Sequence, residues 1–292
     1  MTIKEQWANH KRRTHKALAM RRTTSERFYD MHAKRYSKGD YFTNPSLRAR
    51  TAMSFADDIT WHFILRYLPQ RKSALILDAG AGDGYWTERL IKRGYRNIVL
   101  YDISQGMLEE AKERLSKLKV KRQIQFIRGD IANMHQLRSN AFDYVFSQYD
   151  AVSYSMKPAK AIRELARVAK SRSHVVVSLD TKFRRVPELI EAGQINAAEA
   201  LLKTDVSDEF GFSQYNLTWE KLAFHFKAAG LEVVEIVGAP VFMHQVKERS
   251  LAELEKDLKI RKRLLRIELL NCTNTSLVNF AGHLQMIGKK IR

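Results

Sequence analysis

From residue 73 onward, the chain alternates short, mostly apolar runs with amphipathic segments, and this alternation restricts the possible folds more than any other feature. The apolar runs lie at 74–77, 98–101, 124–127, 144–147 and 174–179. Between two of them, residues 104–118 show helical spacing of leucine and alanine behind Ser104, a natural N-cap. Strands that are apolar throughout and separated by helices indicate a parallel sheet covered on both faces.

The C-terminal part of the chain adds two further strands to this sheet. A helix is expected to begin after Thr218 and to end at Gly230, with a strand over 231–237. Residues 283–288 alternate polar and apolar side chains, which favours a strand with one exposed face, and we expect this last strand to be antiparallel. The sequence therefore predicts a doubly wound α/β fold with a mostly parallel sheet of about seven strands.

Helices are expected before the sheet. Residues 3–22 form the first, a second begins at Thr23 with Glu26 completing a capping box, and a third runs from about 52 to 67 before Pro69. We therefore expect two parts, an N-terminal helical segment over 1–72 and a core domain over 73–292.

Two stretches of the core do not fit the strand count. Residues 181–217 are rich in apolar and aromatic side chains, and residues 247–270 form one long amphipathic pattern. We expect both to be cap elements around a site, with plain packing against the core as the alternative.

The positive charge is concentrated at the two ends of the chain. The formal net charge of the whole protein is +19, and residues 1–50 hold 13 Lys/Arg against 4 Asp/Glu. Residues 247–292 hold 11 Lys/Arg against 5 Asp/Glu, which leaves 27 Lys/Arg and 23 Asp/Glu for residues 51–246. Basic ends can follow phosphates or an anionic surface, or they can be solvated helix faces.

Several classes of protein are excluded by composition. The longest apolar stretches are only a few residues, so we expect no transmembrane segment, and the N-terminus carries no apolar signal-peptide core. The single cysteine, Cys272, excludes a disulfide framework and a cysteine-rich metal site. We expect a cytoplasmic protein without a metal centre.

The most informative stretch is Leu75-Ile76-Leu77-Asp78-Ala79-Gly80-Ala81-Gly82-Asp83-Gly84-Tyr85, a strand followed by a glycine-rich turn and a helix. Glycines let a ligand approach the backbone at a helix N-terminus. The third glycine comes one residue too early for a dinucleotide fingerprint. Asp78 before the turn suits a ligand with an ammonium group better than a pyrophosphate.

Two more carboxylates follow at the ends of the next strands. Asp102 can accept hydrogen bonds from both ribose hydroxyls, and Asp130 can accept one from the exocyclic amine of adenine. The ends of neighbouring parallel strands lie at one edge of the sheet, so a single pocket is expected there. It suits a cationic adenosine that carries an amino acid.

With these residues the chain resembles the class I S-adenosylmethionine-dependent methyltransferases, which have a Rossmann-like fold. The likeness rests on Leu77–Gly84, Tyr101-Asp102-Ile103-Ser104, Gly129-Asp130-Ile131 and Phe142–Ser147, and covers residues 73–180 well. It implies S-adenosylmethionine as the cofactor and S-adenosylhomocysteine as the product. The resemblance also implies that the N-terminal segment closes over the cofactor, with Tyr36 covering the methionine part. The cofactor-binding residues implied in this way are Tyr36, Asp78, Gly80, Ala81, Gly82, Asp102, Ile103, Met107, Asp130, Ile131, Ser147 and Gln148.

The methyl acceptor is less constrained. After the fourth strand the chain reads Ser147-Gln148-Tyr149-Asp150 instead of the Asn/Asp-Pro-Pro-Tyr of enzymes that methylate adenine or amide nitrogens. A lone cysteine also excludes methylation of cytosine carbon. If the acceptor arrives protonated, a general base is needed. The strongest candidates are Tyr149, Asp150 and His244, with Tyr154 and His135 behind them.

Four functions stay open on this basis, one of which, methylation of a protein side chain, has no signature in the sequence. The first is methyl transfer to a small or medium-sized molecule, which the near-neutral middle and the aromatic insertion favour. The second is RNA methylation with phosphates held by the basic ends. The third is a non-catalytic nucleic-acid-binding protein with the same fold, which the complete set of glycines and carboxylates disfavours. The oligomeric state is not indicated.

Overall fold

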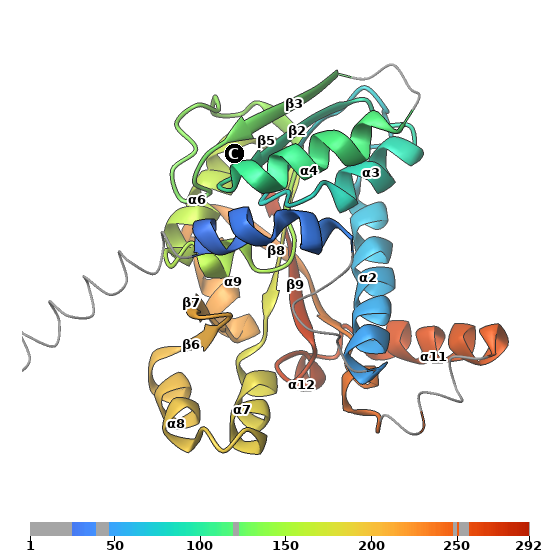
Figure 1. The fold of residues 1–292 in the computed structure, drawn as a ribbon. Helices are drawn as coiled ribbons and strands as arrows, with labels where there is room; N and C mark the ends of the chain where they lie inside the picture. The colour runs from blue at the N-terminus through green and yellow to red at the C-terminus, as the bar shows by residue number, and fades with distance from the viewer. Residues whose placement is uncertain (1–24, 39–46, 119–122, 248–249, 251–256, 292) are drawn as a thin grey trace, which may run out of the picture.

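The computed structural model describes residues 25–38, 47–118, 123–247, 250 and 257–291 of the 292-residue chain. One seven-stranded sheet, in the order β3-β2-β1-β4-β5-β9-β8, forms its centre (Figure 1). Its strands are β1 (Leu75–Ala79), β2 (Asn97–Asp102), β3 (Gln123–Arg128), β4 (Phe142–Ser147), β5 (Ala169–Asp180), β8 (Leu231–Ala239) and β9 (His283–Lys290). β9 pairs antiparallel with β5 and β8, whereas all pairs among the first five strands are parallel. The predicted fold class is therefore confirmed.

The central strands are buried on both faces, as their continuous apolar sequences require. In β1, every residue after Leu75 is buried, and β4 is buried except at Asp143. β3 lies at the edge of the sheet and has no fully buried residue. Each predicted apolar run lies within a strand or, at Ala74, one residue before it.

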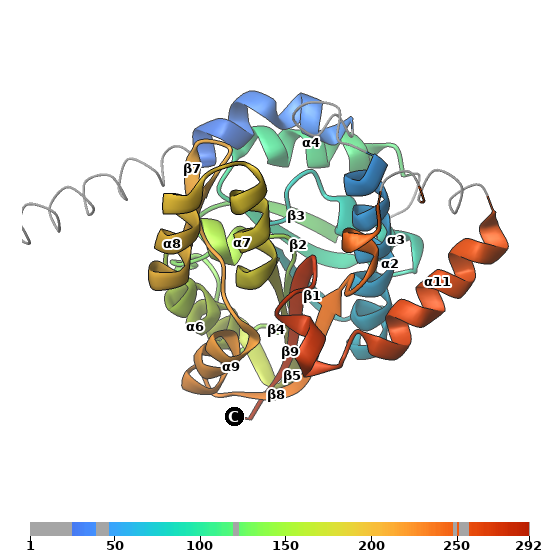
Figure 2. The same ribbon diagram turned by 90° about the horizontal axis from the view of Figure 1, so that it is seen from below.

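Helices cover both faces of the sheet (Figure 2). One face packs against α2 (Leu47–Tyr67), α3 (Tyr85–Lys92) and α4 (Gln105–Ser116), and the other against α6 (Pro158–Val168) and α9 (Trp219–Ala228). The alternation along β1 shows this directly, since Ile76 joins the first cluster and Leu77 the second. Ser104 caps α4 as predicted, because its side chain accepts the Met107 N–H. Among the helices described, none has the length and apolar character that crossing a bilayer requires.

The expected capping-box helix is present over residues 25–37, although Thr23 and the expected helix over 3–22 lie outside the described residues. Helix 25–37 lies across α4 (Figure 1) and is held there by polar contacts. The Asp30 carboxylate accepts the Ser104 hydroxyl at 2.6 Å and the Gly106 N–H at 3.0 Å. Farther along the helix, the Ser37 hydroxyl donates to Glu110 at 2.6 Å. The contacts fix helix 25–37 over the carboxyl ends of the first strands.

The two stretches outside the strand count have different structures. Residues 181–217 form α7 (Lys182–Glu191), α8 (Ile195–Thr204) and the hairpin of β6 (Val206–Glu209) and β7 (Phe212–Tyr215). In the second stretch, α11 (Leu258–Asn271) is the helix described; Ser250 is also helical, and residues 248–249 and 251–256 lie outside the described residues. The short elements are α5 (Ala151–Tyr154), η1 (Met243–Gln245) and α12 (Thr275–Val278).

Candidate cofactor and acceptor site

A pocket lies at the carboxyl ends of β1–β4, beneath helix 25–37. Its volume is about 1050 Å³, which includes the part that is open to solvent. Because the sheet order is β3-β2-β1-β4, the pocket extends from the end of β3 to the end of β4. The polar and aromatic lining residues are Ser25, Tyr29, Tyr36, Asp57, Asp83, Tyr85, Trp86, Tyr101, Asp102, Asp130, Gln148, Tyr149, Tyr154 and Ser155.

The glycine-rich turn after β1 forms the floor of the pocket. Gly80 and Gly82 both have positive φ, at 76° and 53°. A Cβ atom on Gly80 would lie 2.2 Å from the Cβ of Ala151, so no larger residue fits without displacing α5. The Gly80 N–H donates to the Tyr101 carbonyl at 2.7 Å, which holds the turn against β2. A ligand can therefore approach this backbone closely.

Asp102, at the end of β2, is held by backbone groups. One carboxylate oxygen accepts the Gly82 N–H at 2.8 Å and the other accepts the Ser104 N–H at 2.9 Å. Burial raises the pKa of Asp102 to about 6, against the effect of these two hydrogen bonds. The carboxylate is thus ionised at neutral pH, and each oxygen keeps a lone pair for a ligand hydroxyl.

Asp130 follows β3, the strand next to β2, and lines the same pocket. One of its carboxylate oxygens accepts the Ala132 N–H at 3.1 Å. Gly129 before it has no room for a side chain, since a Cβ would lie 1.9 Å from the Tyr101 hydroxyl oxygen. The carboxylate is therefore set into the pocket wall at the far end from β4.

Asp78 lies beneath the glycine-rich turn and is not among the lining residues. Its side chain is buried and accepts the Thr87 hydroxyl of α3 at 2.7 Å. Burial, assisted by the nearby Asp102 and Asp83, raises the pKa of Asp78 to about 7, although the Thr87 hydrogen bond lowers it.

This raised pKa predicts a pH-dependent difference between the wild type and Asp78→Asn. The folded protein binds one more proton than the unfolded chain between pH 4 and 7, so wild-type stability is lost as pH rises through that window. Asp78→Asn lacks this proton, and its free energy of unfolding should improve relative to wild type by about 1 kcal/mol per pH unit there. Urea titrations at pH 5, 6, 7 and 8 measure the difference, and a difference independent of pH would refute the assignment.

The end of β4 contributes polar groups that have no partner among the described residues. Ser147 Oγ and Gln148 Nε2 are both buried without a hydrogen bond, and Gln148 lines the pocket. A buried polar atom without a partner is costly unless a ligand or water pairs with it. The groups are therefore suited to a polar ligand at the β1–β4 boundary.

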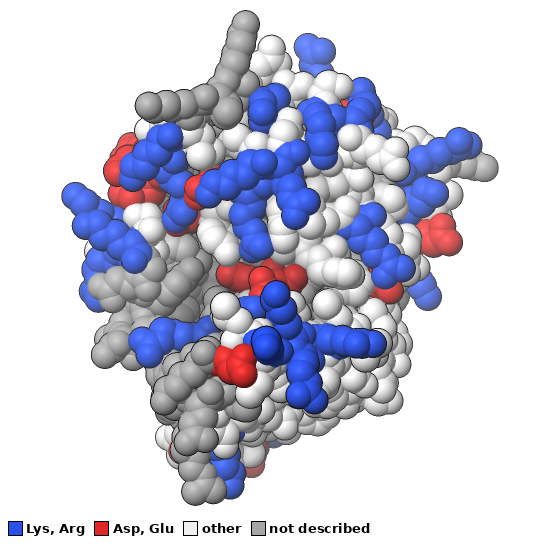
Figure 3. All heavy atoms as spheres, turned by 90° about the vertical axis from the view of Figure 1, so that its right-hand side faces the viewer, with Lys and Arg blue, Asp and Glu red and all other residues white. Residues whose placement is uncertain are grey.

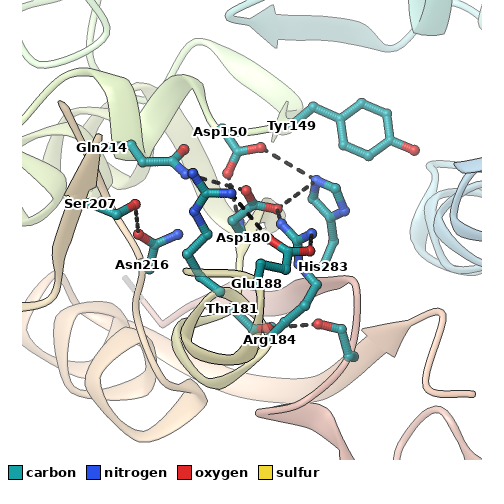
Figure 4. A network of polar contacts seen from close by, with 12 residues as sticks. Tyr149, Asp150, Asp180, Thr181, Arg184, Glu188, Ser207, Gln214, Asn216 and His283 are labelled. Carbon is teal, nitrogen blue, oxygen red and sulfur yellow. Dashed lines mark hydrogen bonds and ion pairs between the residues drawn. The ribbon is translucent and has the colours of Figure 1, made fainter. Parts of the chain in front are cut away.

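Tyr149 and Asp150 follow β4 with positive φ angles of 54° and 72°. Such angles in consecutive residues other than glycine cost energy and concentrate at functional sites. The two side chains point in different directions (Figure 4). Tyr149 lines the pocket, whereas Asp150 points into a buried network behind it.

That buried network joins Asp150 to residues of β5 and β9 (Figure 4). His283 Nε2 lies 3.4 Å from an Asp150 oxygen and 3.3 Å from an Asp180 oxygen. Burial alone would lower the pKa of His283, but Asp180 and Asp150 outweigh it and raise the pKa. Burial and Asp180 raise the pKa of Asp150. Candidate ligand atoms of the three residues lie within 4.8 Å of one another, but Arg184 lies 2.8 Å from the same Asp180 oxygen and already supplies positive charge.

A second cluster, which no sequence pattern indicates, lies on the pocket side of Tyr149. Asp57 of α2 accepts hydrogen bonds from the hydroxyls of Tyr149 and Tyr85, the latter at 2.9 Å. The Trp86 ring lies 5.7 Å from that of Tyr149. Burial raises the pKa of Asp57, against the two phenol hydrogen bonds. Asp57 is 92 residues from Tyr149 in the chain, and no local pattern connects them.

The pocket brings together most of the residues that the sequence singled out. Those that line it are Tyr36, Gly80, Ala81, Gly82, Asp102, Ile103, Met107, Asp130, Ile131, Gln148, Tyr149 and Tyr154. Those outside the lining are Asp78, His135, Ser147, Asp150 and His244. His244 is on η1, next to α2. Asp150 is next to the lining residue Tyr149 in the chain but does not line the pocket itself. The roles of all these residues stay predictions.

The domain that forms this pocket has recognisable relatives. Residues 76–172 match the family described as "Methyltransferase domain". This stretch of the chain is therefore a methyltransferase domain. No curated protein matches the chain in sequence.

Solved structures share the whole fold at low sequence identity. A putative methyltransferase complexed with the Trm112 activator of Haloferax volcanii is 16% identical over 91% of this chain and 97% of its own, with a TM-score of 0.60. Magnesium protoporphyrin IX methyltransferase from Synechocystis PCC 6803 is 15% identical over 92% and 99%, with a TM-score of 0.57. The [4+2]-cyclase SpnF is 15% identical over 91% and 94%, with a TM-score of 0.56. The fold alone therefore does not specify the reaction.

The cofactor prediction agrees with the domain and the pocket. The Synechocystis enzyme has been solved with bound S-adenosylhomocysteine and with bound S-adenosylmethionine. In this methyltransferase domain, the glycine floor, the two carboxylates of β2 and β3 and the unpartnered groups after β4 fit the same ligand. The domain match and these neighbours support S-adenosylmethionine as the cofactor.

Proposed function

We propose that this protein transfers the methyl group of S-adenosylmethionine to a small or medium-sized acceptor. The observation that carries this proposal is the covered pocket, in which helix 25–37 lies over the strand ends. Tyr29 of this helix contacts Tyr154 at 5.9 Å between ring centroids and Phe212 of β7 at 6.1 Å. Aromatic residues from three separate segments therefore meet above the strand ends, as a site for a small ligand requires.

Each part of the pocket has a distinct role in this proposal. Asp130 holds the adenine and Asp102 the ribose, while the backbone of the Gly80–Gly82 turn and Gln148 hold the methionine part. The bound cofactor supplies a methyl group on positively charged sulfur. The acceptor then lies at the β4 end beside Tyr149, because the β3 and β2 ends are occupied by adenosine. The chain contributes positioning for in-line displacement, and Tyr36 helps to exclude water.

The direct test is calorimetric titration of Asp102→Asn with S-adenosylhomocysteine. Asparagine keeps the shape of the side chain but loses the charge that strengthens hydrogen bonds to ribose hydroxyls. Two such bonds at about 1.5–3 kcal/mol each predict a loss of affinity of about 100-fold or more. The wild type should show saturable binding at one site.

Glu113→Ala on α4 is the matched control for this titration. Glu113 is exposed, and its side chain pairs with Lys117 one turn later, so its loss should leave binding unchanged. Melting temperatures of both variants establish that the fold persists. Wild-type affinity in Asp102→Asn would refute the cofactor assignment.

RNA is the second candidate acceptor, and one surface favours it. The face that carries α2, α3 and α11 is rich in Lys and Arg (Figure 3). On α11 these are Lys259, Arg261, Lys262, Arg263 and Arg266. In this alternative the phosphates are held outside the pocket while the core performs the chemistry. Salt-dependent RNA binding that is lost when residues 1–22 are removed would favour it over the small-molecule acceptor.

The domain organisation remains part of the proposal. In this proposal the segment 1–72 closes over the cofactor. Of the two helices described in it, helix 25–37 lies over the pocket and α2 packs against one face of the sheet. Within the 73–292 core, the β6–β7 hairpin reaches α5 beside the β4 end through Phe212, whose ring is 5.1 Å from that of Tyr154. We infer that 181–217 and 247–270 act as cap elements around the acceptor.

A further inference from the structure

The pocket presents charge of a single sign. Four carboxylates belong to its described lining residues: Asp57, Asp83, Asp102 and Asp130. None of the lining residues in the described part of the chain is Lys, Arg or His, although the protein as a whole has a formal net charge of +19. An anionic acceptor would be repelled from such a pocket, whereas a cationic one would be attracted.

Three of these carboxylates already have a role. Asp83 forms an ion pair with Arg114 of α4. Asp102 and Asp130 are at the β2 and β3 ends, where the proposed function places the adenosine. Asp57 remains, and its partner Tyr149 places it at the β4 end, where the acceptor binds.

Asp57 is surrounded by aromatic rings. Tyr149 and Tyr85 both donate their hydroxyls to its carboxylate. The Trp86 ring lies 5.0 Å from the ring of Tyr85 and 5.7 Å from that of Tyr149, so the three rings form one cluster next to the carboxylate. A carboxylate attracts an ammonium group through its charge, and neighbouring aromatic rings can add cation–π interaction.

One cation already lies on this aromatic cluster, outside the pocket lining. Arg89 of α3 donates to the Tyr85 hydroxyl at 3.2 Å, and its guanidinium lies 4.5 Å from the ring centroid of Trp61 and 5.3 Å from that of Trp86, but it is not a lining residue. Asp58 follows Asp57 on α2 and pairs with Arg261 of α11 at 2.6 Å, outside the lining. Asp57 is therefore the carboxylate that faces the pocket from α2.

We propose that the methyl acceptor is an amine, which enters the pocket as an ammonium ion and binds against Asp57 and the adjacent aromatic rings. This inference rests on the proposed function and narrows it to nitrogen methylation. It also gives a role to Asp57, which the cofactor does not need.

The chemistry of this step balances with groups already present. An N–H bond of the ammonium breaks, and its proton moves to the Asp57 carboxylate. The freed lone pair on nitrogen forms a bond to the methyl carbon, while the carbon–sulfur bond breaks and its electron pair stays on sulfur. The products are the methylated ammonium ion, S-adenosylhomocysteine and protonated Asp57, which returns its proton to water. Burial raises the pKa of Asp57, and this suits a group that must accept a proton.

Two probes of equal shape and different charge test the proposal. Choline and 3,3-dimethylbutan-1-ol differ by the exchange of N⁺ for carbon, and neither needs to be the natural acceptor. Calorimetry on protein saturated with S-adenosylhomocysteine should show choline binding at least about tenfold more tightly than the alcohol. Asp57→Asn should remove this preference, whereas Asp58→Asn, the adjacent acid on the same helix, should keep it.

The possible results separate this inference from the function on which it rests. Equal affinity for the two probes, or no saturable choline binding, in protein that binds S-adenosylhomocysteine would overturn the amine proposal alone. If Asp57→Asn instead lowers the affinity for S-adenosylhomocysteine, Asp57 serves the cofactor and the amine proposal is again overturned. Failure of the wild type to bind S-adenosylhomocysteine would overturn the proposed function, and the inference with it.

Discussion

Replacing Glu268 by alanine should lower the free energy of unfolding by about 4 kcal/mol. The Glu268 side chain is 1% exposed, and its carboxylate accepts three backbone N–H groups, from Val241 at 2.7 Å, Phe242 at 2.9 Å and Met243 at 2.7 Å. Alanine would leave all three donors without this acceptor, and those of Val241 and Met243 are buried. A buried donor without a partner costs about 1–3 kcal/mol, which makes the sum large for one substitution.

Denaturant unfolding followed by tryptophan fluorescence measures this loss. Glu268→Gln should fall between wild type and Glu268→Ala, because the amide keeps one oxygen but places an NH₂ group against a donor. Glu232→Ala, an exposed glutamate of β8, should change stability by less than about 0.5 kcal/mol. A loss below about 1 kcal/mol in Glu268→Ala would show that water replaces the carboxylate and that α11 is not anchored by it.

Gly80→Ala should reduce the affinity for S-adenosylhomocysteine by about 100-fold or more, and should destabilise the fold as well. Alanine at a φ of 76° costs about 1–2 kcal/mol, and its Cβ would lie only 2.2 Å from that of Ala151. The overlap must displace either the turn or α5, and both carry pocket residues. The expected signature is loss of binding in protein that still unfolds cooperatively.

Gly193→Ala separates the clash from the backbone strain. Gly193 has a φ of 70°, and a Cβ atom on it would meet nothing within 4 Å, so alanine there adds strain without overlap. It should cost about 1 kcal/mol of stability and leave S-adenosylhomocysteine binding unchanged. Equal binding losses in the two variants would point to general destabilisation and away from a special role of Gly80.

Apolar pattern and glycine spacing are enough to predict the sheet. A mostly apolar run such as 144–147 has to be buried on both faces, and burial of that kind occurs in a parallel sheet between helices. The carboxylates Asp102 and Asp130 are predictable for the same reason, since the strand ends place them at one edge. The edge strand β3 lies within one residue of the predicted run 124–127 at each end, although none of its residues is fully buried.

The acceptor end of the pocket depends on contacts between distant segments. Asp57 and Tyr149 are 92 residues apart, and His283 meets Asp150 only because β9 inserts between β5 and β8. The sequence singles out His244 as a titratable residue, yet it packs near α2 outside the pocket. Sequence by itself determined the fold class and the cofactor end, because strand period and turn geometry are local properties. Only the tertiary structure decided which side chains face the acceptor, because this depends on how helices from separate parts of the chain pack across the sheet.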